Sequence, residues 1–166
     1  MIPLAAKFLF LILCYALGIV GGVFLHELGH ALVALCVTRQ PIEMEIGKGP
    51  KCVSFGVGRL RIRLSLRGLR YGLTRYDRGR ETRGRQALVA LGGPMASLAA
   101  LIGFGALTVN SQVGEWVWIF GLAATIANFR IFIVAIWPIE YRPEGEGGQV
   151  WLSDGLDLWH LLRSKQ

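Results

Sequence analysis

Two histidines and a glutamate lie close together near the start of the chain, in the stretch His26-Glu27-Leu28-Gly29-His30. On an α-helix, His26 and His30 are four residues apart and lie on one face, one turn above the other. Two imidazoles in this arrangement can share one Zn²⁺, and Glu27 is then beside the open coordination position of the metal as a general base. The pattern therefore predicts a metal-dependent hydrolytic site.

The apolar setting of this motif distinguishes it from a chance occurrence. The same pattern arises in soluble helices, where the histidines are surface residues or satisfied core residues. Here it lies in an apolar run from about Lys7 to Val37, and its flanks supply no polar partners. Ionisable side chains are costly in hydrocarbon, and a buried His-Glu-His cluster without a metal is difficult to satisfy. We therefore expect a metal site inside a membrane-length helix.

The composition indicates an integral membrane protein of one domain, residues 1–166. The chain is 53% hydrophobic and carries a formal charge of +7. Residues 39–85 hold 13 Lys or Arg and 4 acidic residues, a net charge of +9. A basic protein can bind nucleic acid, but this charge lies between apolar spans, where the positive-inside rule accounts for it, and we expect no nucleic-acid partner. The three cysteines fit neither a disulfide framework nor a Cys-ligated zinc site.

Three apolar segments predict membrane-spanning helices at about residues 7–37, 86–109 and 116–137. The first is longer than a bilayer requires, since its 31 residues would extend about 46 Å against about 30 Å of hydrocarbon. We expect it to be kept as a signal anchor, because cleavage would remove the motif. With three spans, the basic segment 39–85 and the tail 138–166 lie on the same side of the membrane. The positive charge of that segment predicts that this side is the cytoplasm, so the N-terminus is expected outside and the C-terminus inside.

The basic insertion at about residues 41–75 has a different pattern, with apolar and polar residues in alternation. This period is typical of β-strands, and we expect a small antiparallel sheet at the cytoplasmic membrane face, its arginines toward headgroups or solvent. Two roles stay open for it: a plain connection, or an edge strand that pairs with the extended backbone of a substrate. The Arg-rich residues 75–85 resemble RNA-binding runs, but beside a span they are more typical of a headgroup-facing flank.

Further residues can complete the site. Residues 91–97 in the second span are mostly small, which favours the close helix packing that a site between helices needs. Asn128 either lines the site or makes a helix–helix hydrogen bond. Near the C-terminus, Ser153 or Asp154 caps a short amphipathic helix that ends at Arg163.

Three landmarks in this order resemble the site-2 protease family of intramembrane zinc metalloproteases, in a minimal form. They are the motif 26–30 in a membrane helix, the segment from Gly92 to Ser97, and Ser153-Asp154-Gly155. The resemblance implies a catalytic core of three transmembrane helices, one Zn²⁺ per chain, and hydrolysis of a peptide bond in or near the transmembrane segment of a substrate.

The resemblance also implies a role for individual residues. His26 and His30 match the two histidine ligands, Glu27 matches the catalytic glutamate, and Asp154 matches the aspartate that completes the metal coordination. Gly93 and Ser97 match the ends of the family's glycine-to-small-polar motif.

The sequence departs from the family at the third ligand. The family usually has an asparagine three residues before a proline that Leu-Asp-Gly closely follows. Here Ala135 has that place, and Asp154 lies sixteen residues after Pro138. Other candidate ligands within reach by sequence are Glu140, Glu144, Glu146, Asp157 and His160.

These observations predict an all-α membrane protein with a three-helix metalloprotease core and a small cytoplasmic sheet. The expected partners are the lipid bilayer and a transmembrane or membrane-associated protein substrate, and the oligomeric state stays open. The compact chain favours a bacterial inner membrane. One rival function is a non-catalytic zinc-binding scaffold or adaptor, which a fourth protein ligand such as His160 would favour. Another is a membrane-anchored protease for soluble or misfolded proteins, against which the apolar flanks of the motif argue.

Overall fold

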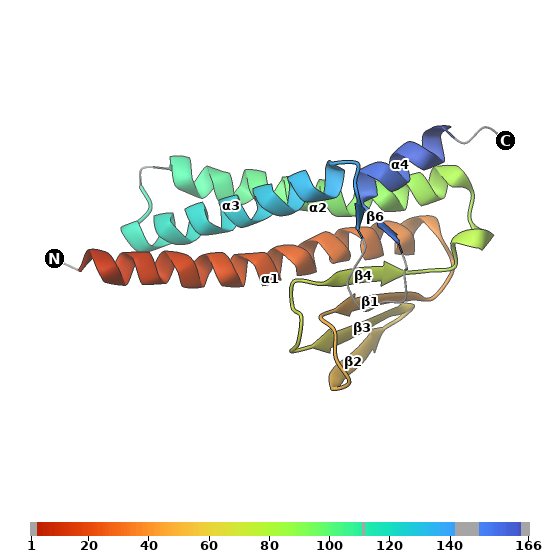
Figure 1. Ribbon diagram of the computed structural model, residues 1–166, viewed down its shortest axis with the longest axis horizontal. Coiled ribbons are helices and arrows are strands. Elements are labelled where there is room, and N and C mark those ends of the chain that lie inside the picture. The colour runs from red at the N-terminus through yellow and green to blue at the C-terminus, as the bar shows by residue number, and fades with distance from the viewer. Residues whose placement is uncertain (1–2, 111, 142–149, 164–166) are drawn as a thin grey trace.

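Three long helices and a small β-sheet form the fold (Figure 1). The computed structural model describes residues 3–110, 112–141 and 150–163. The helices are α1 (Leu4–Val37), α2 (Arg83–Val109) and α3 (Glu115–Ile136), and each is long and apolar enough to cross a membrane. The 34 residues of α1 extend about 51 Å, well beyond a hydrocarbon core of about 30 Å. The predicted fold class, a mostly helical membrane protein with three spans and a small sheet, is confirmed.

Local sequence explains where these helices begin and end. α1 stops shortly before Pro41, whose ring and missing N–H cannot continue a helix. The Thr82 hydroxyl accepts a hydrogen bond from the Arg85 amide and so caps the start of α2. α3 ends just before Pro138, because a proline disfavours the helical conformation of the residue that precedes it.

Small residues line the contacts between the helices. Where α1 meets α2, a Cβ atom on Gly92 would lie 2.6 Å from the carbonyl oxygen of Gly29. Where α1 meets α3, a Cβ atom on Gly18 would lie 3.1 Å from the Cβ of Ala127. The helix backbones therefore approach one another closely, which agrees with the packing expected from the small residues at 91–97.

The segment between α1 and α2 forms a four-stranded sheet in the order β2-β3-β1-β4. Its strands are β1 (Ile42–Ile46), β2 (Cys52–Val57), β3 (Leu60–Ser65) and β4 (Gly72–Arg75). β2 and β3 form an antiparallel hairpin and β4 is antiparallel to β1, but β1 and β3 are parallel. The prediction of an antiparallel sheet is therefore wrong for the central pair, because alternation reveals the faces of a strand and not the direction of its neighbour.

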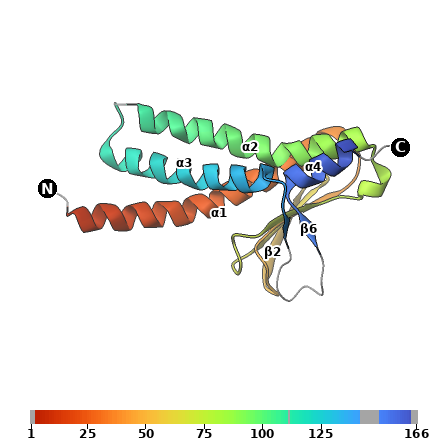
Figure 2. The same ribbon diagram turned by 45° about the horizontal axis from the view of Figure 1, so that its top comes forward.

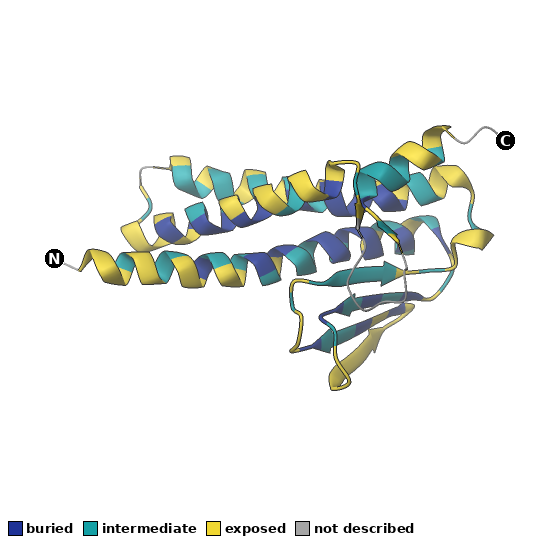
Figure 3. Cartoon of the chain, viewed as in Figure 1, coloured by how far each residue is buried: buried dark blue, intermediate teal, exposed yellow. Residues whose placement is uncertain are grey.

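One face of this sheet packs against the C-terminal half of α1 (Figure 3). Ile42, Met44 and Ile46 of β1 are fully or almost fully buried there, beside Ala31 and Ala34 of α1. The charged residues of β1 and β3 alternate with these apolar ones and lie on the opposite face. The arginines of β3 therefore point away from α1, as the alternation predicts.

After α3 the chain turns back toward the other helices. The short strands β5 (Glu140–Tyr141) and β6 (Trp151–Leu152) pair with each other, and α4 (Asp154–Arg163) follows directly. α4 lies beside the first part of α2 (Figure 2). This packing carries the start of α4 back to the part of α1 that holds the histidines.

Candidate metal centre

Three side chains from two distant parts of the sequence converge between the helices. The Nε2 atoms of His26 and His30 on α1 lie 3.2 Å apart. From the first residue of α4, the Asp154 carboxylate places Oδ2 3.0 Å from the His26 Nε2 and Oδ1 3.3 Å from the His30 Nε2. His26 and His30 are only 9% and 8% exposed. The structure thus brings together all three residues that the sequence predicts as metal ligands.

The spacing of these donors fits a zinc ion. Zinc bonds of about 2.0–2.1 Å to nitrogen or oxygen in a tetrahedron put neighbouring ligand atoms about 3.3 Å apart. Here the two Nε2 atoms are 3.2 Å apart, and each lies 3.0–3.3 Å from a different oxygen of the Asp154 carboxylate. Among the described residues, no other His, Cys, Asp or Glu joins this cluster. Two imidazoles and one carboxylate are also a donor set that catalytic zinc sites use, with one position left for water.

The outer nitrogens of both imidazoles have partners on α2. The His30 Nδ1 lies 2.6 Å from the Val89 carbonyl oxygen and 3.2 Å from the Gly93 amide nitrogen, and the shorter contact requires a proton on Nδ1 because a carbonyl oxygen can only accept. The His26 Nδ1 lies 2.9 Å from the hydroxyl oxygen of Ser97, which is fully buried. A hydrogen bond at Nδ1 fixes the ring and leaves Nε2 as the free ligand atom. Both rings are therefore oriented for metal binding.

The backbone of α2 leaves room for an ion in front of these rings. A Cβ atom on Gly93 would collide with the His30 Nε2 and lie 2.7 Å from the His26 Nε2. A larger residue at this position would fill the space between the two ligand nitrogens. Gly93 is therefore a requirement of the site geometry.

Ser153 fixes the position of Asp154. Its hydroxyl accepts hydrogen bonds from the Leu156 amide at 3.2 Å and the Ile139 amide at 3.1 Å, and donates to the Trp137 carbonyl at 2.7 Å. Of the two residues expected to cap α4, Ser153 and Asp154, it is thus Ser153 that does so, and it ties the start of α4 to the chain that leaves α3. Asp154 is sixteen residues after Pro138 in the sequence, and the pairing of β5 with β6 brings the chain back so that Asp154 lies near the end of α3.

The charge of Asp154 suits a metal ligand. Burial by itself would raise the pKa of this carboxyl, but hydrogen bonds and charges from His26 and His30 lower it from 3.8 to about 2. The group is therefore an anion at any physiological pH.

Glu27 lies beside the cluster but outside the set of donors. It is 7% exposed, and its Oε2 lies 2.7 Å from the Thr74 hydroxyl of β4. A carboxylate next to the donors but not among them has the position expected of a general base.

The remaining candidates do not join the cluster. Asn128 is 1% exposed, and its Nδ2 donates to the Ala124 carbonyl of its own helix at 2.8 Å. Asp157 forms an ion pair with Arg78 at 2.9 Å. Glu140 and His160 lie in β5 and α4 and are not part of the donor group. Glu144 and Glu146 lie outside the described residues.

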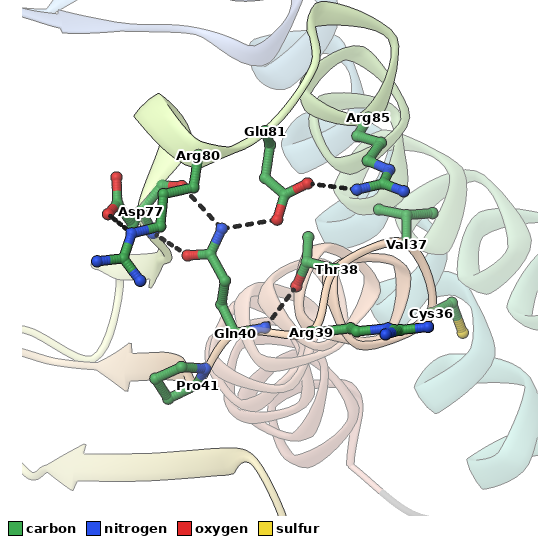
Figure 4. A pocket seen from close by; sticks show the side chains of 10 residues that line it. All are labelled: Cys36, Val37, Thr38, Arg39, Gln40, Pro41, Asp77, Arg80, Glu81 and Arg85. Carbon is green, nitrogen blue, oxygen red and sulfur yellow. Dashed lines mark hydrogen bonds and ion pairs between the residues drawn. The ribbon is translucent and has the colours of Figure 1, made fainter.

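A polar cavity of about 950 Å³ lies elsewhere, where α1 ends and α2 begins (Figure 4). Gln40 crosses it and donates to the Glu81 carboxylate at 2.6 Å, while Arg85 pairs with the same carboxylate at 3.0 Å. The Arg85 and Gln40 hydrogen bonds lower the pKa of Glu81. This cavity contains none of the converging donors, so it is separate from the cluster of His26, His30 and Asp154.

Comparison with known protein families matches residues 4–137 to the peptidase M50B-like family. The chain belongs to this family. The match supports the site-2 protease assignment and identifies a multi-pass integral membrane protein of the peptidase type. Comparisons with curated proteins and with solved structures gave no match.

The family match includes His26, Glu27 and His30 but ends before Asp154. The case for Asp154 therefore depends on the distances in the structure. Sequence reasoning missed Val89 and Thr74. Val89 acts through its main-chain carbonyl, which no side-chain pattern reveals, and Thr74 is an ordinary strand residue until the sheet packs against α1.

Ser97→Ala removes the hydroxyl that partners the His26 Nδ1. Since outer partners of histidine ligands typically contribute about 10–100-fold to metal affinity, we expect zinc binding to weaken by that factor. Competition with a chromophoric chelator measures it, and Ser54→Ala on the exposed strand β2 is the matched control. Equal affinity in the two variants would contradict this role for Ser97.

Proposed function

We propose that the protein is an intramembrane zinc metalloprotease that hydrolyses a peptide bond in or near the transmembrane segment of a substrate. The observation that supports this most is the convergence of His26, His30 and Asp154 beside Glu27, in which each histidine Nε2 lies 3.0–3.3 Å from an oxygen of the Asp154 carboxylate. This cluster lies in a helix that is apolar enough to cross a membrane, in a chain of the peptidase M50B-like family.

In this proposal His26, His30 and Asp154 hold one zinc ion. When bound, zinc polarises the scissile carbonyl and lowers the pKa of water toward neutrality. Glu27 accepts a proton from the attacking water and passes it to the nitrogen of the leaving amine. A helical substrate must unwind locally to present its backbone, because the carbonyl of a helix is otherwise hydrogen-bonded within the helix.

The position of the site along α1 is consistent with this chemistry. His26 lies 22 residues after Leu4, or about 33 Å along the helix, close to the limit of a hydrocarbon core of about 30 Å. Water can reach a site at this depth. The net charge of +9 over residues 39–85 supports a cytoplasmic location for that end of the helix and an outside N-terminus. A bacterial inner membrane, and a membrane-embedded or membrane-associated substrate, remain part of the proposal.

The scaffold alternative requires a closed coordination sphere. The example named for a fourth ligand, His160, does not join the donor group. Among the described residues three donors converge, which leaves a position for water. This geometry favours the protease over a purely structural zinc site.

Glu27→Gln removes the proposed base but keeps the size of the side chain. We expect peptide hydrolysis to fall by about 100-fold or more while zinc content is unchanged, because Glu27 is not a donor to the metal. The assay uses purified protein in detergent with fluorescein-labelled β-casein, an unfolded chain that offers extended backbone. Glu43→Gln on the outer face of the sheet is the control, and full activity in Glu27→Gln would exclude Glu27 as the base.

A further inference from the structure

We propose that Thr74 is a positioning residue, whose hydroxyl holds the Glu27 carboxylate in place beside the metal cluster. The proposal rests on the function proposed above, because it assigns Thr74 a role through the proposed base. It concerns a residue of the sheet, outside α1, the helix that carries the motif.

Direct contacts support this role. The Thr74 hydroxyl oxygen lies 2.7 Å from the Glu27 Oε2, within the range of a hydrogen bond to a carboxylate. It also lies 3.1 Å from the main-chain oxygen of Glu27. The Thr74 hydroxyl thus contacts both the side-chain carboxylate and the main-chain carbonyl of Glu27. These two contacts fix the position of β4 along α1.

The side-chain sizes in β4 support it independently. In the register with β1, Thr74 pairs with Met44 and Gly72 pairs with Ile46. Paired residues share a face, so Thr74 and Gly72 belong to the face that packs against α1. A Cβ atom on Gly72 would lie only 2.5 Å from the Glu27 Cγ. Two small residues on this face therefore make a space that the Glu27 side chain occupies.

The sheet can hold the carboxylate because the sheet itself is firmly packed. Met44 and Ile46, the neighbours of Thr74 and Gly72, are 0% and 2% exposed. A glutamate without such a partner samples several rotamers, and ordering it costs conformational entropy at each catalytic cycle. A hydroxyl fixed by a packed strand removes that freedom and keeps the base within reach of the attacking water.

The test compares Thr74→Val, which keeps the shape and removes the hydroxyl, with Thr74→Ser, which keeps the hydroxyl. Thr125→Val is the matched control, because the Thr125 hydroxyl bonds within α3, to the Gly121 carbonyl at 2.7 Å. With fluorescein-labelled β-casein, we expect kcat of Thr74→Val to fall about 10-fold or more with little change in KM. Thr74→Ser and Thr125→Val should stay close to the unmodified protein, and all variants should bind equal zinc.

A second measurement does not depend on activity. Thermal unfolding in detergent is compared for Thr74→Val, Glu27→Ala and the double variant. Glu27→Ala is used because a glutamine could still accept the hydrogen bond. If the hydroxyl acts through Glu27, Thr74→Val lowers Tm in the presence of Glu27 but has little further effect in the Glu27→Ala background.

The outcomes separate this proposal from the proposed function. Additive Tm changes, or a kcat in Thr74→Val equal to that of Thr74→Ser, would overturn the positioning role even if the protein is an active protease. If the unmodified protein and Glu27→Gln are equally inactive, the proposed function fails, while non-additive Tm changes still support the contact between Thr74 and Glu27. Loss of zinc from Thr74→Val would also overturn the proposal, because it would mean a role in metal binding.

Discussion

The cost of burying ionisable side chains in an apolar helix determines much of this structure. The three ionisable residues of the motif in α1 are each less than a tenth exposed, so each needs a partner. α2 supplies the Val89 carbonyl and the Ser97 hydroxyl, α4 supplies the Asp154 carboxylate, and β4 supplies the Thr74 hydroxyl. Three elements therefore meet α1 at one place, and the two imidazoles and the Asp154 carboxylate lie together there.

The partners divide into two groups by origin. Those on α2 come from a helix whose backbone lies close to that of α1 at Gly29 and Gly92, so the imidazoles are oriented by a closely packed pair of helices. The other two partners, Asp154 and Thr74, come from elements outside the long helices. The site is thus complete only when α4 and the sheet are packed against the helical core.

The sequence predicted the parts of the fold that depend on local pattern. Hydropathy located three spans, and the spacing of His26 and His30 identified two donors on one helix face. Asp154 was assigned only through the family resemblance. It is far from the histidines in sequence, and the pairing of β5 with β6, which brings it to the site, leaves no local pattern around Asp154. The parallel pairing of β1 with β3 and the contact of Thr74 with Glu27 depend on which strand packs where, and residue alternation cannot determine that.

The central claim is that His26, His30 and Asp154 bind one zinc ion while Glu27 remains a separate base. Metal analysis of purified protein, comparing the unmodified chain with Asp154→Ala and Glu27→Gln, tests it most directly. The account predicts about one zinc per chain in the unmodified protein and in Glu27→Gln, and a strong loss in Asp154→Ala, since one of three protein ligands is removed. An unmodified protein without zinc, or an Asp154→Ala variant that binds zinc as well as the unmodified protein, would contradict it.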